Sequence, residues 1–129
     1  MILLDTRALV WMVAEPKRLS RTAQSAIQNA QRSDGVCISA ITLWELAALL
    51  VRGRIQAYGT VDASIRLLVE GVTVKPITPE VATLAIQFPE DFSRDPADRL
   101  IGATSRAEGM KLITKDEKMH KSRLLNIVW

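Results

Sequence analysis

Short apolar runs alternate with helical patterns along the whole chain, and this alternation limits the fold more than any other feature. The apolar runs predict strands at 2–4, 36–38, 72–76, 111–114 and 124–128. Apolar residues at helical spacing, bounded by caps such as Ser20 and Gly109, predict helices at 7–14, 21–32, 40–52, 60–70, 79–88 and 96–108, with a short charged helix after Asp116. Strands separated by helices form a parallel sheet that is covered on both faces. The sequence therefore predicts an α/β fold.

The length of 129 residues is typical of one globular domain, and we expect a single domain over 1–129. The longest apolar stretch, 8–14, is too short to span a bilayer, and no export signal is visible at the start. The single cysteine, Cys37, has no partner for an internal disulfide, which fits a reducing compartment. We expect a cytoplasmic protein that makes no membrane contact.

Five carboxylates stand where an expected strand ends or an expected helix begins. Asp5 follows the first strand, Glu45 lies in the early turns of the helix after the second strand, and Asp116 follows the fourth strand. Asp95 and Asp98 open the helix before that fourth strand. In a parallel α/β fold these positions share one edge of the sheet, so the five acids should face one crevice. Crowded carboxylates either take up protons or bind a cation, which predicts a divalent metal site.

Four of these acids also have an ordinary structural interpretation. Asp5, Asp95 and Asp116 stand where each would cap the helix that follows, a role that aspartate fills often. Pro96 is suited to the first helical position, and Asp98 three residues after Asp95 matches a variant of the capping box. Each of the four acids, taken alone, is therefore explained by helix capping.

Glu45 is harder to explain as a structural residue. Its neighbours one helical turn away include Ile41 and Leu49, so its carboxylate leaves an apolar face. A buried carboxylate without a partner is so unfavourable that it protonates, pairs or binds a metal. An ion pair with Arg7 or Arg99 is the alternative, and the four other acids at the same edge favour metal.

The net charge and the basic residues suggest an anionic partner. The formal net charge is +3, and lysine and arginine are dense in the last third of the chain. Such a surface attracts phosphate groups, although scattered basic residues are also common on the solvated faces of ordinary enzymes. Two divalent ions in the acidic site would increase the positive charge and favour an anionic substrate.

Other catalytic schemes find less support in the sequence. Cys37 is expected in a buried strand and His120, the only histidine, in a charged exposed segment, so a cysteine–histidine pair is not favoured. An aspartyl-phosphate site of the kind that follows a first strand has a second aspartate where this chain has Arg7. Trp11, Met12 and Trp44 are candidates for a dimer or partner groove, but core packing is the favoured interpretation.

Four segments resemble the motifs of one known family. They are Leu-Leu-Asp-Thr at 3–6, Ile-Thr-Leu-Trp-Glu-Leu-Ala at 41–47, Arg-Asp-Pro-Ala-Asp-Arg-Leu-Ile at 94–101 and Leu-Ile-Thr-Lys-Asp-Glu at 112–117. Together they resemble the PIN-domain family, and in particular the VapC-like toxins of bacterial toxin–antitoxin pairs. One such motif is weak, but four in the family's order over nearly the whole chain are specific.

The resemblance implies a three-layer α/β/α sandwich with a five-stranded parallel sheet. It also implies an endoribonuclease that depends on one or two Mg²⁺ or Mn²⁺ ions and leaves a 5′-phosphate and a 3′-hydroxyl, which fits a metal-activated water as the nucleophile. By motif position, the catalytic metal ligands would be Asp5, Glu45, Asp98 and Asp116. Asp95 would be a further acid beside them.

Three hydroxyl side chains lie near the expected strand ends. Thr6, Ser39 and Thr114 are placed where their hydroxyls could orient metal ligands or water. For each of them, hydrogen bonding to the backbone is the simpler alternative.

The chain departs from the family pattern at two positions. It has Arg7 where relatives often carry histidine, and Leu49 where they often carry lysine. Arg7, Arg94 and Arg99 are candidate contacts to the RNA backbone, although Arg99 could instead pair with Asp95 or Asp98. These departures bear on substrate contacts more than on the acids.

The resemblance further implies a homodimer whose acidic clefts are blocked by a cognate antitoxin protein. Two alternatives to a toxin ribonuclease stay open. One is a catalytically inactive PIN fold that binds RNA or protein, and the other is a PIN nuclease that acts on DNA or in RNA processing. The small size and the absence of a recognition domain favour a toxin.

Overall fold

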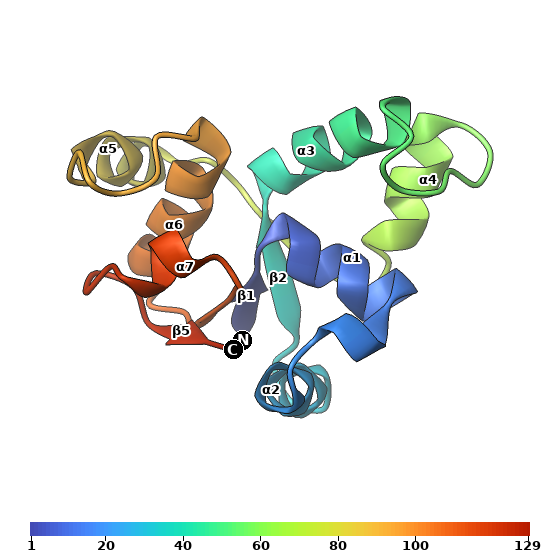
Figure 1. Ribbon diagram of the computed structural model, residues 1–129, viewed down its shortest axis with the longest axis horizontal. Coiled ribbons are helices and arrows are strands. Elements are labelled where there is room, and N and C mark those ends of the chain that lie inside the picture. Colours follow the sequence, from blue (N-terminus) through green and yellow to red (C-terminus); the bar gives the residue numbers. More distant parts are fainter.

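Five parallel strands form one sheet in the computed structural model, which describes residues 1–129. The strands are β1 (Ile2–Leu4), β2 (Val36–Ser39), β3 (Thr73–Lys75), β4 (Leu112–Ile113) and β5 (Ile127–Val128). Their order in the sheet is β3-β2-β1-β4-β5, so β1 is the central strand (Figure 1). Leu3 is in register with Cys37 on one side and with Leu112 on the other. The predicted parallel sheet is confirmed.

The last three strands are shorter than the sequence predicts. The expected strands 72–76, 111–114 and 124–128 are reduced to Thr73–Lys75, Leu112–Ile113 and Ile127–Val128. The apolar residues Val72, Leu124 and Leu125 precede the first residue of their segment that pairs with a neighbouring strand, and only paired residues belong to the sheet.

Seven α-helices connect or flank the strands, and each begins at a side chain that accepts a backbone amide. The helices are α1 (Thr6–Ala14), α2 (Arg21–Gln31), α3 (Ala40–Val51), α4 (Val61–Leu68), α5 (Pro79–Gln87), α6 (Pro96–Glu108) and α7 (Glu117–His120), with a 3-10 turn, η1 (Pro16–Arg18), after α1. Their caps are, in order, Asp5, Ser20, Ser39, Thr60, Thr78, Asp95 and Asp116. Three of these seven caps are acids that the sequence also assigned to a metal site.

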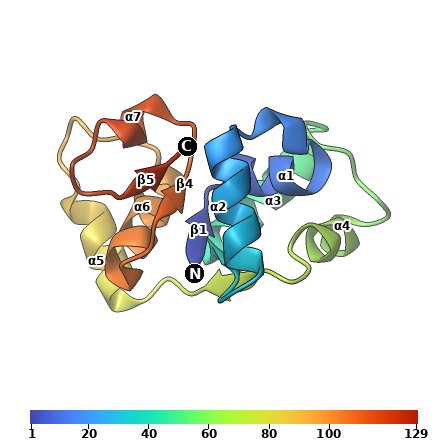
Figure 2. The same cartoon turned by 90° about the horizontal axis from the view of Figure 1, so that it is seen from below.

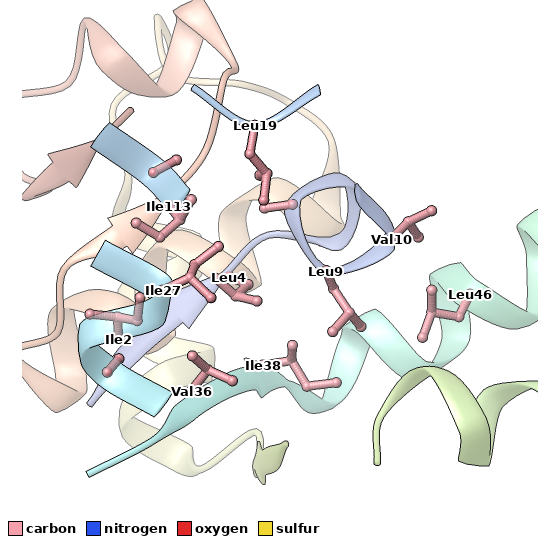
Figure 3. Packing of buried hydrophobic residues seen from close by; sticks show 13 residues of the cluster. Ile2, Leu4, Leu9, Val10, Leu19, Ile27, Val36, Ile38, Leu46 and Ile113 are labelled. Atoms are coloured by element: carbon pink, nitrogen blue, oxygen red, sulfur yellow. The ribbon is translucent and has the colours of Figure 1, made fainter. Parts of the chain in front are cut away.

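Successive residues of β1 point to opposite faces of the sheet and enter two separate apolar clusters. Ile2 and Leu4 pack with α1, α2 and Leu46 of α3 in one cluster, which Figure 3 shows from close by. Leu3 belongs to the other cluster, which includes buried residues of α5 and α6. Figure 2 shows α1 and α2 on one side of the sheet and α5 and α6 on the other. The expected three-layer α/β/α sandwich is therefore confirmed. None of the helices has the length and the apolar character that a membrane-spanning helix needs.

The strand order places a switch point beside β1. From β1 the chain proceeds through α1 and α2 to β2 and then β3 on one side, whereas β4 and β5 are added later on the other. In open α/β sheets a crevice opens outside the carboxyl ends of the strands at such a point. Asp5 directly follows β1 and Asp116 comes shortly after β4. The fold thus brings the two ends of the sequence together at one edge.

Candidate functional site

A cleft of about 660 Å³ lies at the carboxyl ends of β1 and β4, and residues of α1, α3, α6 and α7 line it. Its lining is mostly charged, with two hydrophobic residues among twelve: Asp5, Thr6, Arg7, Trp11, Arg18, Glu45, Asp95, Asp98, Ile101, Lys115, Asp116 and Glu117. All five acids that the sequence placed at this edge therefore line one cleft.

Six residues of the lining, which include the five acids named from the sequence, form two groups according to the elements that carry them. The N-terminal wall comes from the start of the chain and from α3, and consists of Asp5, Thr6 and Glu45. The C-terminal wall comes from the starts of α6 and α7, and consists of Asp95, Asp98 and Asp116.

Asp5 is the most enclosed carboxyl of the cleft. It caps α1 by accepting a hydrogen bond from the Ala8 amide at 2.8 Å. Its pKa is raised from 3.8 to about 6, chiefly by burial, while the Thr114 hydroxyl and the Ala8 amide oppose the rise and the charge of Asp98 adds to it. At neutral pH Asp5 is therefore an anion in an environment that disfavours the charge.

Glu45 is held by a hydroxyl and has no basic partner. The Thr6 hydroxyl donates to Glu45 Oε1, and Thr6 Oγ1 lies 3.1 Å from Thr42 Oγ1 in a buried pair. Burial raises the pKa of Glu45, the Thr6 hydrogen bond opposes this, and the charges of Asp95, Asp98 and Asp5 raise it further. The ion pair with Arg7 or Arg99 that the sequence left open is not formed.

Asp95 and Asp98 differ in their contacts although both belong to the C-terminal wall. Asp95 caps α6 by accepting from the Ala97 amide at 2.9 Å. Asp98 Oδ2 instead accepts from the Ser93 hydroxyl at 2.7 Å, so the predicted capping box is wrong because Ser93 supplies the contacts. Burial raises the pKa of Asp98, and the nearby charges of Asp95 and Asp116 add to the rise, against the Ser93 hydrogen bond.

Asp116 is the third capping acid of the cleft. Its Oδ1 accepts from the Lys118 amide at 2.8 Å at the start of α7, and its own amide donates to Thr114 Oγ1 at 3.0 Å. The Thr114 hydroxyl also lowers the pKa of Asp5, so this side chain influences an acid of each wall. The Thr114 side chain is fully buried.

The donor set of the cleft fits a hard divalent cation. Its possible ligands are carboxylate and hydroxyl oxygens, and neither histidine nor cysteine lines it. No three acidic, histidine or cysteine side chains converge on one point. Mg²⁺ and Mn²⁺ keep several waters and need only a few carboxylates, so an open arrangement of acids suits a hydrated ion of this class.

The other residues suggested by the sequence lie in different surroundings. Arg7 lines the cleft, but neither Arg94 nor Arg99 does. The Arg99 guanidinium donates to backbone carbonyls, which is an interaction the sequence did not indicate and not a pair with Asp95 or Asp98. Ser39 is buried outside the cleft lining, and its hydroxyl accepts from the Ile41 amide at the start of α3.

The aromatic side chains divide between packing and exposure. Trp11 and Met12 pack against the first apolar cluster, as expected, but Trp44 is 66% exposed, so the core interpretation is wrong for that residue. Trp11 also lines the cleft, and its ring centroid lies 5.9 Å from that of Trp129. Trp11 lies one helical turn after Arg7 on α1. This spacing is the sequence signal that could have placed both side chains at the cleft.

The cysteine and the histidine do not form a pair. Cys37 is buried in β2, where burial raises the pKa of its thiol to about 11. The ring Nε2 of His120 lies 2.7 Å from the Thr114 carbonyl oxygen. The buried thiol and the exposed imidazole expected from the sequence are confirmed.

Comparisons with known proteins bear on the family and the fold of this chain. The sequence profile of the PIN domain matches residues 2–123. Ribonuclease VapC22 of Mycobacterium tuberculosis is 42% identical to this chain over 122 residues, which are 95% of this chain and 92% of that protein. This chain belongs to the PIN-domain family. The family expected from the four motifs is thereby confirmed.

Solved structures of other PIN-fold chains agree in architecture. A chain of VapBC2 from Rickettsia felis, bound to a DNA fragment from the promoter, matches 98% of this PIN domain and 97% of its own length, with a TM-score of 0.74 and 15% identity. A chain of a toxin–antitoxin complex from Klebsiella pneumoniae matches 100% of this PIN domain and 97% of its own length, with a TM-score of 0.69 and 19% identity. At these identities the likeness concerns the fold.

Proposed function

We propose that this PIN domain is an endoribonuclease, the toxin of a toxin–antitoxin pair, which hydrolyses RNA phosphodiester bonds with a Mg²⁺- or Mn²⁺-activated water. The observation that carries the proposal is the cleft of acids at the switch point of the sheet, three of which have a raised pKa. The identity of 42% to a ribonuclease supports RNA as the substrate.

The acids have distinct roles in this proposal. Asp5 and Asp98 would hold one cation, with Asp116 nearby, and Glu45 would hold a second ion if two bind. A bound ion of this class lowers the pKa of a coordinated water and neutralises charge on the phosphate. Without cations the carboxylates would repel the RNA backbone, since both are anionic.

The hydroxyls and the basic residues of the cleft complete the site. Thr6 orients Glu45 through a hydrogen bond, and Thr114 accepts the Asp116 amide and favours the charged form of Asp5. Arg7, Arg18 and Lys115 are exposed at the cleft and attract phosphates that flank the scissile bond. Arg7 thus keeps the RNA-binding role expected of it, whereas Arg94 and Arg99 are replaced in this role by Arg18 and Lys115.

The proposed partners follow from the relatives. Chains of this fold occur in complexes called VapBC and in a toxin–antitoxin complex, which supports a cognate antitoxin for this chain. We expect the chain to act in the cytoplasm as a homodimer. Light scattering of the purified protein tests the dimer, and a mass that corresponds to one chain would contradict it.

A cleavage assay with a matched pair of acid variants tests the activity. Single-stranded RNA is incubated with the wild type, Asp98→Asn or Glu80→Gln, with Mg²⁺ or with EDTA, and the new ends are mapped. Glu80 is an exposed acid of α5 outside the cleft lining. We expect 5′-phosphate ends from the wild type and Glu80→Gln with Mg²⁺ only, and none from Asp98→Asn.

Three outcomes would contradict the proposal and separate its alternatives. Binding of RNA without metal-dependent cleavage would indicate an inactive binding module. Equal cleavage of the 2′-deoxy strand would indicate a nuclease that is not directed at RNA. Cleavage by Asp98→Asn at the wild-type rate would mean that the acidic cleft is not the active site.

A further inference from the structure

Arg99 ties the end of α5 to the segment that precedes α6. Its Nε donates to the Ser93 carbonyl at 2.8 Å, and its Nη1 donates to the carbonyls of Ala85 and Phe88, each at 3.1 Å. Its Nη2 donates to the Pro89 carbonyl at 3.1 Å. These carbonyls lie at or beyond the C-terminal end of α5, where backbone acceptors lack helical partners and a cation is favourable.

The segment that Arg99 holds also packs against α6. The rings of Phe88 and Phe92 are stacked with their centroids 4.1 Å apart, and both are buried. A Cβ at Gly102 of α6 would come within 3.1 Å of Phe88 Cζ, so the glycine allows this close approach. The Arg99 guanidinium lies 5.9 Å from the centroid of Phe92. The segment from 88 to 93 is therefore fixed by packing as well as by hydrogen bonds.

Ser93 connects the fixed segment from 88 to 93 to the acids of the C-terminal wall. Its carbonyl is held by Arg99, while its buried hydroxyl donates to Asp98 Oδ2 at 2.7 Å. The same hydroxyl oxygen lies 3.3 Å from the Asp95 amide, which donates to it. One oxygen of Asp98 is thus occupied by Ser93, and Oδ1 is left to accept a ligand in the cleft.

We propose that Arg99 and Ser93 are positioning residues that orient Asp98 toward a divalent cation before the cation binds, an inference that rests on the proposed metal site. Arg99 acts through the Ser93 backbone and contacts neither the cation nor RNA. Side chains that orient a metal ligand typically contribute about ten- to a hundredfold to metal affinity. A mobile Asp98 would have to be ordered at the moment of binding.

The test is the dissociation constant for Mn²⁺, measured by calorimetry on the full chain without RNA at neutral pH. We expect Arg99→Lys and Ser93→Ala each to weaken Mn²⁺ binding by about ten- to a hundredfold. Because both act through one route, the double variant should lose less than the product of the two losses. Lysine keeps the charge of Arg99 but cannot donate to four carbonyls.

Two residues of the same helix provide matched controls. Arg106 lies with its guanidinium 5.6 Å from the Phe88 ring centroid, and the Ser105 hydroxyl donates to the Met110 carbonyl, so neither contacts Ser93 or Asp98. We expect Arg106→Lys and Ser105→Ala to bind Mn²⁺ like the wild type. Amide hydrogen exchange of the metal-free protein gives a second measurement, in which Ser93→Ala should expose the Asp95 amide.

The outcomes separate this inference from the proposed function. If the wild type binds Mn²⁺ and folded Arg99→Lys and Ser93→Ala bind it equally well, the positioning role is wrong and the metal site stands. If Arg99→Lys binds Mn²⁺ normally but loses affinity for RNA measured in EDTA, Arg99 is an RNA contact. If the wild type itself binds no Mn²⁺, the proposed function fails, and the inference fails with it.

Discussion

The capping positions at the helix starts and the interior of α3 hold carboxylates of the cleft by different means. On the C-terminal wall, Asp95 and Asp116 accept backbone amides as helix caps. On the N-terminal wall, Glu45 projects from within α3 and receives only the Thr6 hydroxyl. A capping acid has a structural reason to be ionised, because the helix N-terminus stabilises its charge. Glu45 has no such reason, which makes it the acid that depends most on a cation.

The largest expected effect separates Asp5, a helix cap that we also expect to bind metal, from Asp95, which acts mainly as a helix cap. We expect Asp5→Asn to reduce RNA cleavage by about a thousandfold or more, or roughly 4 kcal/mol in the barrier. Asp95→Asn should reduce the rate of RNA cleavage by less than about tenfold, since asparagine caps a helix as well as aspartate does. Single-turnover rates with Mg²⁺ measure both. Equal losses of the cleavage rate in the two variants would remove the distinction between a capping acid that binds metal and one that does not.

The second effect is a pH dependence of stability in the metal-free protein. The pKa of Asp5 is raised from 3.8 to about 6, so the folded protein holds a proton between these values that the unfolded chain releases. The free energy of unfolding therefore falls as the pH rises through this window, and stays lower above it. A shift of about two pKa units corresponds to roughly 3 kcal/mol.

Urea unfolding at pH 4 and pH 7.5 measures this dependence. We expect the wild type to lose on the order of 3 kcal/mol more than Asp5→Asn on going to pH 7.5, and Mn²⁺ to restore much of it at pH 7.5 but little at pH 4. If the free energy of unfolding changes equally with pH in the wild type and in Asp5→Asn, Asp5 is not the group that causes the pH dependence.

A third, smaller effect concerns the hydroxyl that holds Glu45. We expect Thr6→Val to weaken Mn²⁺ binding by roughly tenfold, because the shape is kept while the hydrogen bond to Glu45 is lost. Thr42→Val keeps the hydrogen bond between Thr6 and Glu45 and should weaken Mn²⁺ binding by less than about threefold. Calorimetry of both variants provides the comparison. Equal losses of Mn²⁺ affinity in the two variants would mean that the two threonines contribute through packing and not through the hydrogen bond to Glu45.

The smallest effect belongs to the basic side chains of the cleft. We expect Arg7→Gln and Lys115→Gln each to weaken RNA binding a few fold and to reduce the slope of log affinity against log salt by about 0.7. Lys17→Gln, in an exposed residue of η1 outside the cleft lining, serves as the control. Fluorescence anisotropy at several salt concentrations measures the slope. A similar change in the control would assign the effect to overall charge.

Local patterns in the sequence predicted the elements and the acids well, for a physical reason. Alternating apolar runs and caps such as Ser20 and Gly109 act over a few residues, so they can be recognised in one chain. The edge of the sheet at which Asp5 and Asp116 meet follows from the parallel fold alone. The clefts of such folds are therefore accessible to reasoning from sequence.

Contacts between distant segments were not predictable in this way. The strand order depends on pairs such as Leu3 with Leu112, which no local pattern encodes. The contacts of Arg99 arise only when the end of α5 approaches α6, and its neighbours in sequence suggested a carboxylate partner instead. Trp44 was expected in the core because it lies on an apolar helix, yet its own face of α3 is exposed.

The central position of β1 has a consequence for the order of events during synthesis. Ile2–Leu4 and Asp5 are made well before the strand that completes their surroundings, Leu112–Ile113, and before Asp116. The cleft can therefore assemble only after Asp116 has left the ribosome. If the proposed ribonuclease activity requires the complete cleft, a nascent chain cannot cleave RNA before that point.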